Sequence, residues 1–316
     1  MKNKLAIVIL CLVFFVGGWI LHNYYLTLGS SIQLKAVQRQ NLRKILKLKK
    51  GNPIDVVIVE EKDMESYMRR LLRFHWQGFS FDAYLLVPHK HGKKDAAILA
   101  LHGHHTTKED VVGIKRSRFN MDFGLRLVKH GLCVLVPDIP FSDDFEAEDQ
   151  LSVNLIMFGS HITGLRLSYL LALLDYLSSL PFVDSTKMGC VGWSMGGALT
   201  MYLAAVDRRV KVAAISGYFG TYKGAIMKSR NTTDNYIPGI LNFGDMADVA
   251  CLIAPRPLWL EVGEQDPEFP QKAFMEGLKG LKKCYVGQEE HLTWQVIPGG
   301  HRFQGEGIEE WFKRWL

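Results

Sequence analysis

The sequence has few cysteines, and their spacing matches no metal-binding or disulfide motif. Five of the 316 residues are Cys, and no two of them stand as C-x-x-C. This excludes a zinc ribbon and a small domain framed by disulfides. Cys133, Cys190 and Cys251 lie in or beside apolar runs, and Cys284 follows two lysines. We therefore expect mostly buried free thiols and a fold that requires no disulfide.

Repeats, low-complexity tracts and long Pro- or Ser-rich linkers are also absent between residues 55 and 316. Nothing in that stretch marks a boundary between two domains. The chain is 48% hydrophobic, which excludes a disordered or collagen-like protein. These features predict one globular domain of about 260 residues behind an N-terminal appendage.

Acidic residues are missing from the first 54 positions, which carry nine basic ones. The basic residues are Lys2, Lys4, Lys35, Arg39, Arg43, Lys44, Lys47, Lys49 and Lys50. The remaining 262 residues hold 29 basic and 32 acidic side chains, so the main domain is mildly acidic despite the overall charge of +6. Such a domain offers no basic face to a phosphate backbone, and we expect no nucleic-acid partner.

One long run without charge lies at the N-terminus. Residues 5–21 contain no charged side chain, two lysines precede them, and Trp19, Tyr24 and Tyr25 stand where interfacial aromatics would lie. No convincing small-x-small cleavage site follows. We therefore predict an uncleaved transmembrane signal anchor at 1–25, with the main domain outside the cytoplasm; a buried core helix is the alternative. Residues 26–54 are interpreted as a basic linker or membrane-surface helix, and 55–316 as the main globular domain.

Strands and helices alternate through most of residues 55–316. Strands are expected near 56–60, 68–75, 79–87, 96–101, 132–136, 188–192, 210–216, 257–262 and 292–297, with a hairpin at Gln77-Gly78. Helices are expected near 119–130, 162–179, 195–206, 270–281 and 306–315. This order predicts a mostly parallel central sheet with helices on both faces. The stretches 139–161 and 217–250 are too long for simple connections and are expected to form substrate walls or a lid.

A nucleophile motif follows one of these strands. Gly192-Trp193-Ser194-Met195-Gly196-Gly197 stands between the apolar strand ending at Val191 and the helical run from Ala198. A sharp turn from strand to helix accepts only small residues two places on either side, and it exposes the serine hydroxyl. We predict that Ser194 is a catalytic nucleophile.

A serine nucleophile needs a base and an acid that orients the base. Asp266 lies on a short turn after the strand ending at Val262, and His301 follows the strand ending at Ile297 across a Pro-Gly-Gly turn. We predict Asp266 as the acid and His301 as the general base. Glu261 and Glu264 are rival acids, more simply interpreted as solvated loop or strand-end carboxylates. His291 precedes the last strand and is expected to be a surface histidine.

The loop His102-Gly103-His104-His105 is expected to complete an oxyanion hole. The donors would be the amide of Met195 and that of His104, or less favourably His105. The same histidines resemble the start of an H-x-H-x-D-H metal motif, but Thr106 and Thr107 stand where Asp and His are needed. We therefore expect no catalytic metal and no cofactor.

Taken together, the HGHH loop, GWSMGG, GEQDPEFP and PGGH resemble the α/β-hydrolase superfamily in order and spacing. Residues 235–239, 244–248 and 253–258 are similar to the dienelactone hydrolase-like and acetyl xylan esterase-related group. The resemblance implies the α/β-hydrolase fold and a metal-free carboxylesterase that is acylated on Ser194 by a small-molecule ester. Dienelactone hydrolases often use cysteine as nucleophile, so lactone specificity does not carry over to a serine.

Three other functions remain open from the sequence. GWSMGG also resembles the prolyl oligopeptidase type of serine peptidase, although no propeller-sized domain accompanies it, and an acyltransferase could use the same triad. A protein that keeps the fold as a non-catalytic binding module is the alternative from another class. The oligomeric state is not indicated by the sequence.

Overall fold

The computed structural model describes residues 33–49, 54–89, 94–115, 119, 121–228 and 231–316. The predicted anchor at 1–25 lies outside these residues. Within the described ranges, no single helix is both long enough and apolar enough to cross a membrane. The chain divides into two units, Met1–Asn41 and Leu42–Leu316. In the first unit the described residues 33–41 are helical, and the helix continues to residue 45.

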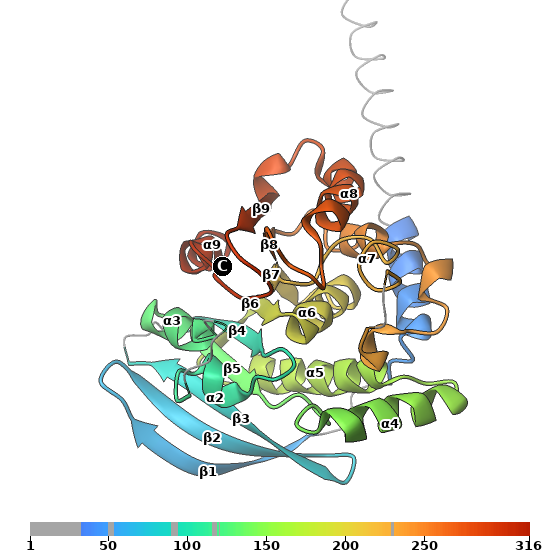
Figure 1. The fold of residues 1–316 in the computed structure, drawn as a ribbon. Helices are drawn as coiled ribbons and strands as arrows, with labels where there is room; N and C mark the ends of the chain where they lie inside the picture. Colours follow the sequence, from blue (N-terminus) through green and yellow to red (C-terminus); the bar gives the residue numbers. More distant parts are fainter. Residues whose placement is uncertain (1–32, 50–53, 90–93, 116–118, 120, 229–230) are drawn as a thin grey trace, which may run out of the picture. The chain divides into compact units, whose positions relative to one another are not determined.

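The second unit is built on a nine-stranded sheet (Figure 1). In chain order the strands are β1 (Asp55–Asp63), β2 (Tyr67–Trp76), β3 (Phe79–Pro88), β4 (Asp95–Leu101), β5 (Cys133–Pro137), β6 (Val183–Trp193), β7 (Val210–Ser216), β8 (Leu258–Gly263) and β9 (Leu292–Ile297). Their order across the sheet is β1-β2-β3-β5-β4-β6-β7-β8-β9. The first three strands and the β3–β5 pair are antiparallel, and all later pairs are parallel.

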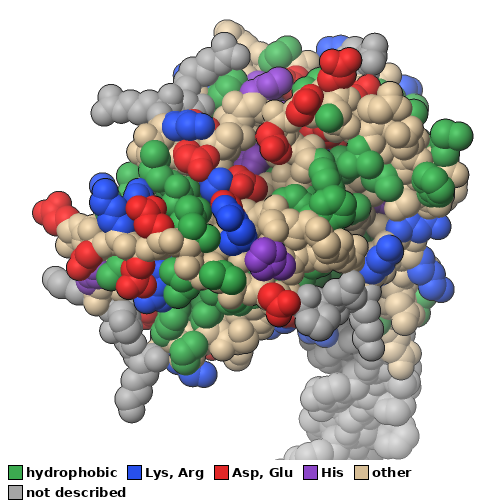
Figure 2. Space-filling model, turned by 90° about the horizontal axis from the view of Figure 1, so that it is seen from below, with side chains coloured by type: hydrophobic (Ala, Val, Ile, Leu, Met, Phe, Trp, Pro, Cys, Tyr) green, Lys and Arg blue, Asp and Glu red, His purple; other side chains and the backbone are tan. Residues whose placement is uncertain are grey.

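Local sequence explains the antiparallel edge. Gln77 and Gly78 have positive φ angles of 51° and 85°, the conformation of the tight turn that matches the twist of a hairpin. This confirms the predicted hairpin. All nine residues of β1 are exposed, so this edge strand carries no core. Figure 2 views the molecule from the side of these strands, where acidic and basic side chains lie beside one another.

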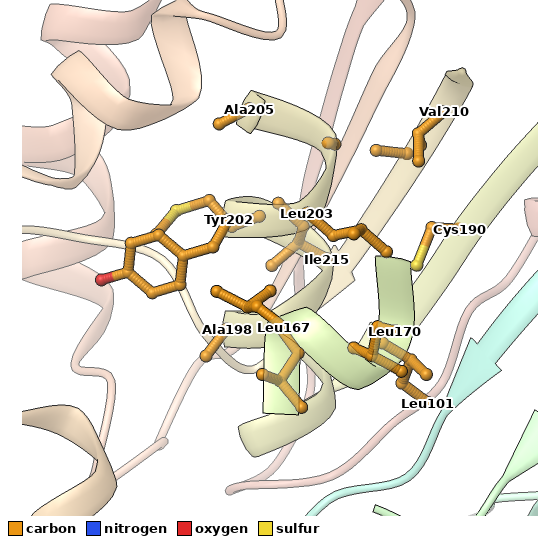
Figure 3. Close-up of a cluster of buried hydrophobic side chains, with 14 of the residues drawn as sticks. Leu101, Leu167, Leu170, Cys190, Ala198, Tyr202, Leu203, Ala205, Val210 and Ile215 are labelled. Carbon is orange, nitrogen blue, oxygen red and sulfur yellow. The ribbon is translucent and has the colours of Figure 1, made fainter. Parts of the chain in front are cut away.

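Helices cover both faces of the parallel part, as predicted. They are α2 (Lys108–Val111), α3 (Phe123–Lys129), α4 (Phe145–Met157), α5 (Ile162–Ser179), α6 (Met195–Val206), α7 (Met246–Cys251), α8 (Gln271–Lys282) and α9 (Ile308–Trp315). Alternate residues of β4 point to opposite sides: Ile98 packs in the core beneath α3 and α9, and Leu99 packs in the core shared with α5, α6 and α8. Figure 3 shows the larger core, in which Leu167 and Leu170 of α5 lie near Leu203 of α6.

The compact unit begins before residue 55, the boundary expected from sequence. Leu42 and Leu46 are fully buried. The backbone amide of Lys49 donates to Ser168 Oγ of α5 at 3.2 Å, and the Ile45 carbonyl lies 3.3 Å from the His161 ring. Burying one leucine side chain contributes about 2 kcal/mol. Residues 42–49 therefore belong to the folded unit, and charge alone could not indicate this.

The expectation of free thiols is wrong for two of the cysteines. Cys251 and Cys284 form a disulfide, which joins the end of α7 to a short 3-10 helix, Lys283–Tyr285. Cys133 and Cys190 are free and buried, as expected. The pairing closes a loop between residues 33 positions apart in the sequence. Sequence spacing did not reveal it because the two cysteines meet only through the packing of α7 against α8.

The two long insertions contain regular structure. Residues 139–161 include the 13-residue helix α4, whose N-cap Asp144 accepts hydrogen bonds from the amides of Glu146 and Ala147. Residues 217–250 include two 3-10 helices, Thr233–Asn235 and Ile240–Asn242, followed by α7. Both insertions follow the carboxyl ends of parallel strands, and so they stand at the edge where active sites of α/β sheets gather.

Candidate active site

Ser194 occupies a strained turn between β6 and α6. Its φ of 55° and ψ of −121° are rare for a residue with a side chain. A Cβ atom at Gly192 would lie 2.1 Å from the Gly196 carbonyl oxygen, and one at Gly196 would lie 2.2 Å from the Leu101 carbonyl oxygen. The two glycines are therefore required for the turn that the sequence predicts around Ser194.

Three residues that lie far apart in the sequence meet at this turn. Ser194 Oγ lies 2.8 Å from His301 Nε2, and His301 Nδ1 lies 2.7 Å from Asp266 Oδ2. The other carboxylate oxygen of Asp266 accepts hydrogen bonds from the amides of Glu268 and Phe269, both at 2.9 Å. The carboxylate is 4% exposed and fixed on both oxygens, so it holds the imidazole in one orientation.

The rival carboxylates take other places. Glu264 is exposed. Glu261 is 1% exposed, so its interpretation as a solvated carboxylate is wrong. It accepts hydrogen bonds from the side chains of Ser216 and Gln295 and from the amides of Gln304 and Gly305. With four donors, Glu261 ties β7, β8, β9 and the segment after His301 together and makes no contact with the imidazole in the described structure.

His291 also stays away from the triad. It lies at the amino end of β9, half-buried, with its ring against Trp315 and its Nδ1 near the Pro255 carbonyl. Of the candidate bases in the sequence, His301 alone among the described histidines contacts Ser194.

A cavity of about 610 Å³ opens over Ser194. Aromatic rings of Phe119, Phe145 and Trp193 line it, and the Trp193 ring lies 4.8 Å from the His301 ring, centroid to centroid. Its polar lining comes from His104, His105, Asp149, Asn231, Thr232 and Glu268. The two insertions therefore supply part of the cavity wall, as the length of these segments suggested.

The loop between β4 and α2 forms one side of this cavity and is fixed by His102. The ring of His102 accepts a hydrogen bond from the Ile139 amide at Nε2 and therefore carries its proton at Nδ1, which donates to the Gly103 carbonyl at 2.9 Å. Complete burial lowers the pKa of His102 to about 4. The imidazole stays neutral at physiological pH and acts as a fixed brace, which the sequence did not reveal.

His104 takes part in a buried charge cluster that sequence reasoning missed. Its Nε2 lies 3.0 Å from Glu148 Oε1 and 3.6 Å from Asp234 Oδ2. Arg166, which is fully buried, lies 2.9 Å from the same Glu148 oxygen and 3.4 Å from the same Asp234 oxygen. These four residues, called here the His104 cluster, connect the β4–α2 loop to α4, α5 and the 3-10 helix Thr233–Asn235.

The His104 cluster pairs two basic side chains, His104 and Arg166, with the carboxylates of Glu148 and Asp234. Burial lowers the pKa of His104, but the hydrogen bond to Glu148 and the charge of Asp234 outweigh burial, and the net pKa is raised. Burial raises the pKa of Glu148, but His104 and Arg166 outweigh it and bring the pKa down to about 2. No local sequence signal marks the cluster, because its members lie up to 130 positions apart in the sequence.

The same cluster provides the one group of possible metal ligands among the described residues. The ligand atoms of His104, Glu148 and Asp234 lie within 4.8 Å of one another. The Arg166 guanidinium, however, already contacts both carboxylates. A divalent cation would therefore have to share the two carboxylates with a buried positive charge. The arrangement is that of an ion-pair network.

Comparison with known proteins places the chain in a family. Residues 81–289 match the dienelactone hydrolase family. The chain belongs to that family. The matched segment includes Ser194 and Asp266 and ends before His301. Over 282 residues the chain is 26% identical to YtaP of Bacillus subtilis (strain 168), a hydrolase by name, covering 85% of this chain and 94% of that relative. The resemblance inferred from the motifs is confirmed, and the chain belongs to a family of hydrolases.

Solved structures agree with this family in fold. A structure described as an acetyl xylan esterase from Bacteroides fragilis NCTC 9343 superposes with a TM-score of 0.75 at 17% identity, over 90% of this chain and 88% of that one. A glucuronoyl esterase from Solibacter usitatus gives a TM-score of 0.64 at 13% identity, over 87% and 90%. At these identities the similarity establishes the α/β-hydrolase fold alone.

Proposed function

We propose that this dienelactone hydrolase family member is a serine carboxylesterase that forms an acyl-enzyme on Ser194. One observation carries the proposal: a continuous hydrogen-bonded chain from the Ser194 hydroxyl through His301 to the buried Asp266 carboxylate, at 2.8 and 2.7 Å. A serine hydroxyl becomes an effective nucleophile when a neighbouring imidazole accepts its proton.

The reaction follows from these contacts. Ser194 Oγ attacks the ester carbonyl carbon while its proton passes to His301 Nε2. Asp266 accepts the Nδ1–H hydrogen bond and stabilises the imidazolium that forms. His301 then donates the proton to the alcohol oxygen as the bond between that oxygen and the acyl carbon breaks, so the alcohol leaves and the acyl group stays on Ser194 Oγ. Water attacks the acyl carbon in the second half-reaction, with His301 again as base.

The negative oxygen that develops in both steps needs donors. We propose the backbone amides of Met195 and His104. Met195 is the first residue of α6, where the unpaired amides of a helix N-terminus favour negative charge. His104 lies in the cavity wall with Ser194. Loss of one such donor typically costs about 100- to 1000-fold in rate.

For the substrate, we propose short acyl esters of polyhydroxylated alcohols. Two structural neighbours are named for carbohydrate esters, acetyl xylan and glucuronoyl. The cavity combines aromatic rings with Asp149, Asn231, Thr232 and Glu268, a lining suited to stacking on a sugar ring and to bonding its hydroxyls.

The test uses the full chain in detergent. We expect hydrolysis of p-nitrophenyl acetate and labelling by a fluorophosphonate, both reduced by about 10⁴-fold or more in Ser194→Ala and His301→Ala. A panel of acetylated sugars, aryl acetates and peptide amides then defines the leaving group. Fluorophosphonate labelling that persists in Ser194→Ala would remove the nucleophile, and cleavage of peptide amides with no ester turnover would point to a peptidase.

We also propose that residues 1–25 anchor the protein in a membrane, with the catalytic unit outside the cytoplasm. The run at 5–21 has the length and composition of a short span, and basic residues precede it. The Cys251–Cys284 disulfide supports the orientation, because structural disulfides persist mainly in oxidising compartments.

A further inference from the structure

The turn between α4 and α5 exposes two large hydrophobic side chains. Met157 is 84% exposed and Phe158 86%, more than any other large hydrophobic residue that the structure describes. Gly159 follows with a φ of 65°, and the chain turns by 99° between α4 and α5. In Figure 1 this turn lies at the right of the view, where α4 ends and α5 begins. Exposure of two adjacent large apolar side chains at a loop tip indicates a binding surface.

The insertion after β7 extends this surface. Met227 is 59% exposed and Leu241 56%, and both line an apolar groove of about 430 Å³ together with Ile156 of α4. We call Ile156, Met157, Phe158, Met227 and Leu241 the α4 patch. Its members come from the two insertions, which are not part of the parallel sheet. Packing of the core therefore does not explain why these apolar side chains are exposed.

Lysines are the most frequent charged residues around the α4 patch. Residues 150–165 and 235–244 contain no Asp, Glu, Lys or Arg, and Asp234 is buried in the His104 cluster. Just outside these ranges, Asp149 and Asp245 are half-buried and Asp248 is exposed. Exposed lysines stand on both sides: Lys223 and Lys228 in the insertion, and Lys44, Lys47 and Lys49 in the N-terminal segment. That segment contacts α5 through the hydrogen bond from Lys49 to Ser168 and the contact of Ile45 with His161, three residues after Phe158. The patch is therefore apolar at its centre, and exposed lysines outnumber exposed acidic residues at its margin.

We propose that the α4 patch docks on an anionic lipid bilayer, with Met157 and Phe158 entering the headgroup region. An apolar surface with basic margins gains both from burial in the interface and from attraction to anionic headgroups. A second copy of the chain is a poorer occupant, because a symmetric contact would bring the same lysines face to face. Docking would give the catalytic unit a fixed orientation on the membrane, and it does not depend on the triad.

The experiment places an environment-sensitive fluorophore on the patch. The full chain with Cys11→Ser and Met157→Cys is labelled with bimane and mixed with phosphatidylcholine vesicles, with or without phosphatidylglycerol, that carry a doxyl-labelled lipid. Ile58→Cys, on the exposed strand β1, is the matched control, since Ile58 is 56% exposed. Cys133 and Cys190 are buried and Cys251 and Cys284 are paired, so the introduced thiol takes the label.

We expect a blue shift and loss of emission at position 157, strongest with phosphatidylglycerol, and little change at position 58. Lys44→Gln with Lys47→Gln should reduce the quenching at 157 on the anionic vesicles. Equal signals from the two labels on vesicle-bound protein would overturn the proposal. A shift at 157 that rises with protein concentration in the absence of lipid would assign the patch to a second copy. Failure of the chain to bind vesicles at all would overturn both this docking and the proposed anchor, while leaving the esterase assay untouched.

Discussion

The position of Asp266 within the triad makes the identity of the acid testable. Its carboxylate contacts His301 Nδ1, whereas Glu264, two residues earlier, is exposed. Asp266→Asn removes the charge that fixes the tautomer and stabilises the imidazolium, and we expect kcat for an acetyl ester to fall by about 10³- to 10⁴-fold. Glu264→Gln is the matched control and should keep wild-type turnover. Equal losses in both variants, measured by steady-state kinetics, would show that the acid is misassigned.

Glu261 illustrates a residue whose role is stability. Four donors converge on its buried carboxylate, so Glu261→Leu would leave those donors unsatisfied in the interior. Each unpaired buried polar group costs about 1–3 kcal/mol, and we expect a loss of at least about 3 kcal/mol in the free energy of unfolding. Urea denaturation measures it. A stability equal to that of the wild type would mean that these hydrogen bonds contribute nothing net.

At the level of elements, the His104 cluster links the β4–α2 loop, α4 and α5, and its pKa shifts define a pH window. The lowered pKa of Glu148 contributes stability that is present above its unfolded value of 4.5 and is lost as the pH falls towards about 2. The raised pKa of His104 contributes stability that is present below its unfolded value of 6.5 and is lost as the pH rises through the folded pKa. The combined contribution is therefore greatest between these two unfolded values.

We accordingly expect Glu148→Gln to lower the free energy of unfolding by about 3 kcal/mol between roughly pH 4.5 and 6.5. The difference from wild type should shrink on either side of that window. Glu146→Gln, an exposed residue of the same helix, is the control and should change stability by less than about 0.5 kcal/mol. Denaturation of all three proteins across the pH range is the measurement, and a difference independent of pH would contradict the charged pairing.

The disulfide between α7 and the segment after α8 should also stabilise the unit. Closing a loop of this length limits the unfolded chain and contributes roughly 3–4 kcal/mol. Cys251→Ser with Cys284→Ser should therefore lower Tm by several degrees, and dithiothreitol should reproduce that shift in the wild type alone. An identical effect of the reductant on the double variant would show that it acts elsewhere.

The sequence predicted those helices, strands and turns whose formation depends on neighbouring residues. The turn around Ser194 depends on adjacent glycines, and the succession of strands and helices along the chain depends on apolar runs, so both could be inferred; the order of the strands across the sheet was not predicted. The start of β6 at Val183 and the shorter α3 were not predicted, because their ends are set by packing. The His104 cluster and the Cys251–Cys284 pair were missed for a related reason. Their partners come together only when α4, α5, α7 and α8 fold onto the sheet, and no local pattern records that.

At the scale of the whole molecule, we ask whether residues 1–30 serve only to attach the protein to a membrane. The compact unit starts at Leu42, and Leu42 and Leu46 complete its core. Deletion of residues 1–30 removes the proposed anchor and leaves only the α4 patch to hold the membrane, so a high-salt wash should release this protein with unchanged kcat and Tm. Deletion of residues 1–50 should also remove the two leucines and cost about 4 kcal/mol. Ultracentrifugation of cell extracts, thermal denaturation and ester turnover separate the two deletions. If the chain lacking residues 1–30 still sediments with membranes after that wash, attachment lies elsewhere on the molecule; if it loses turnover, the segment also supports the fold.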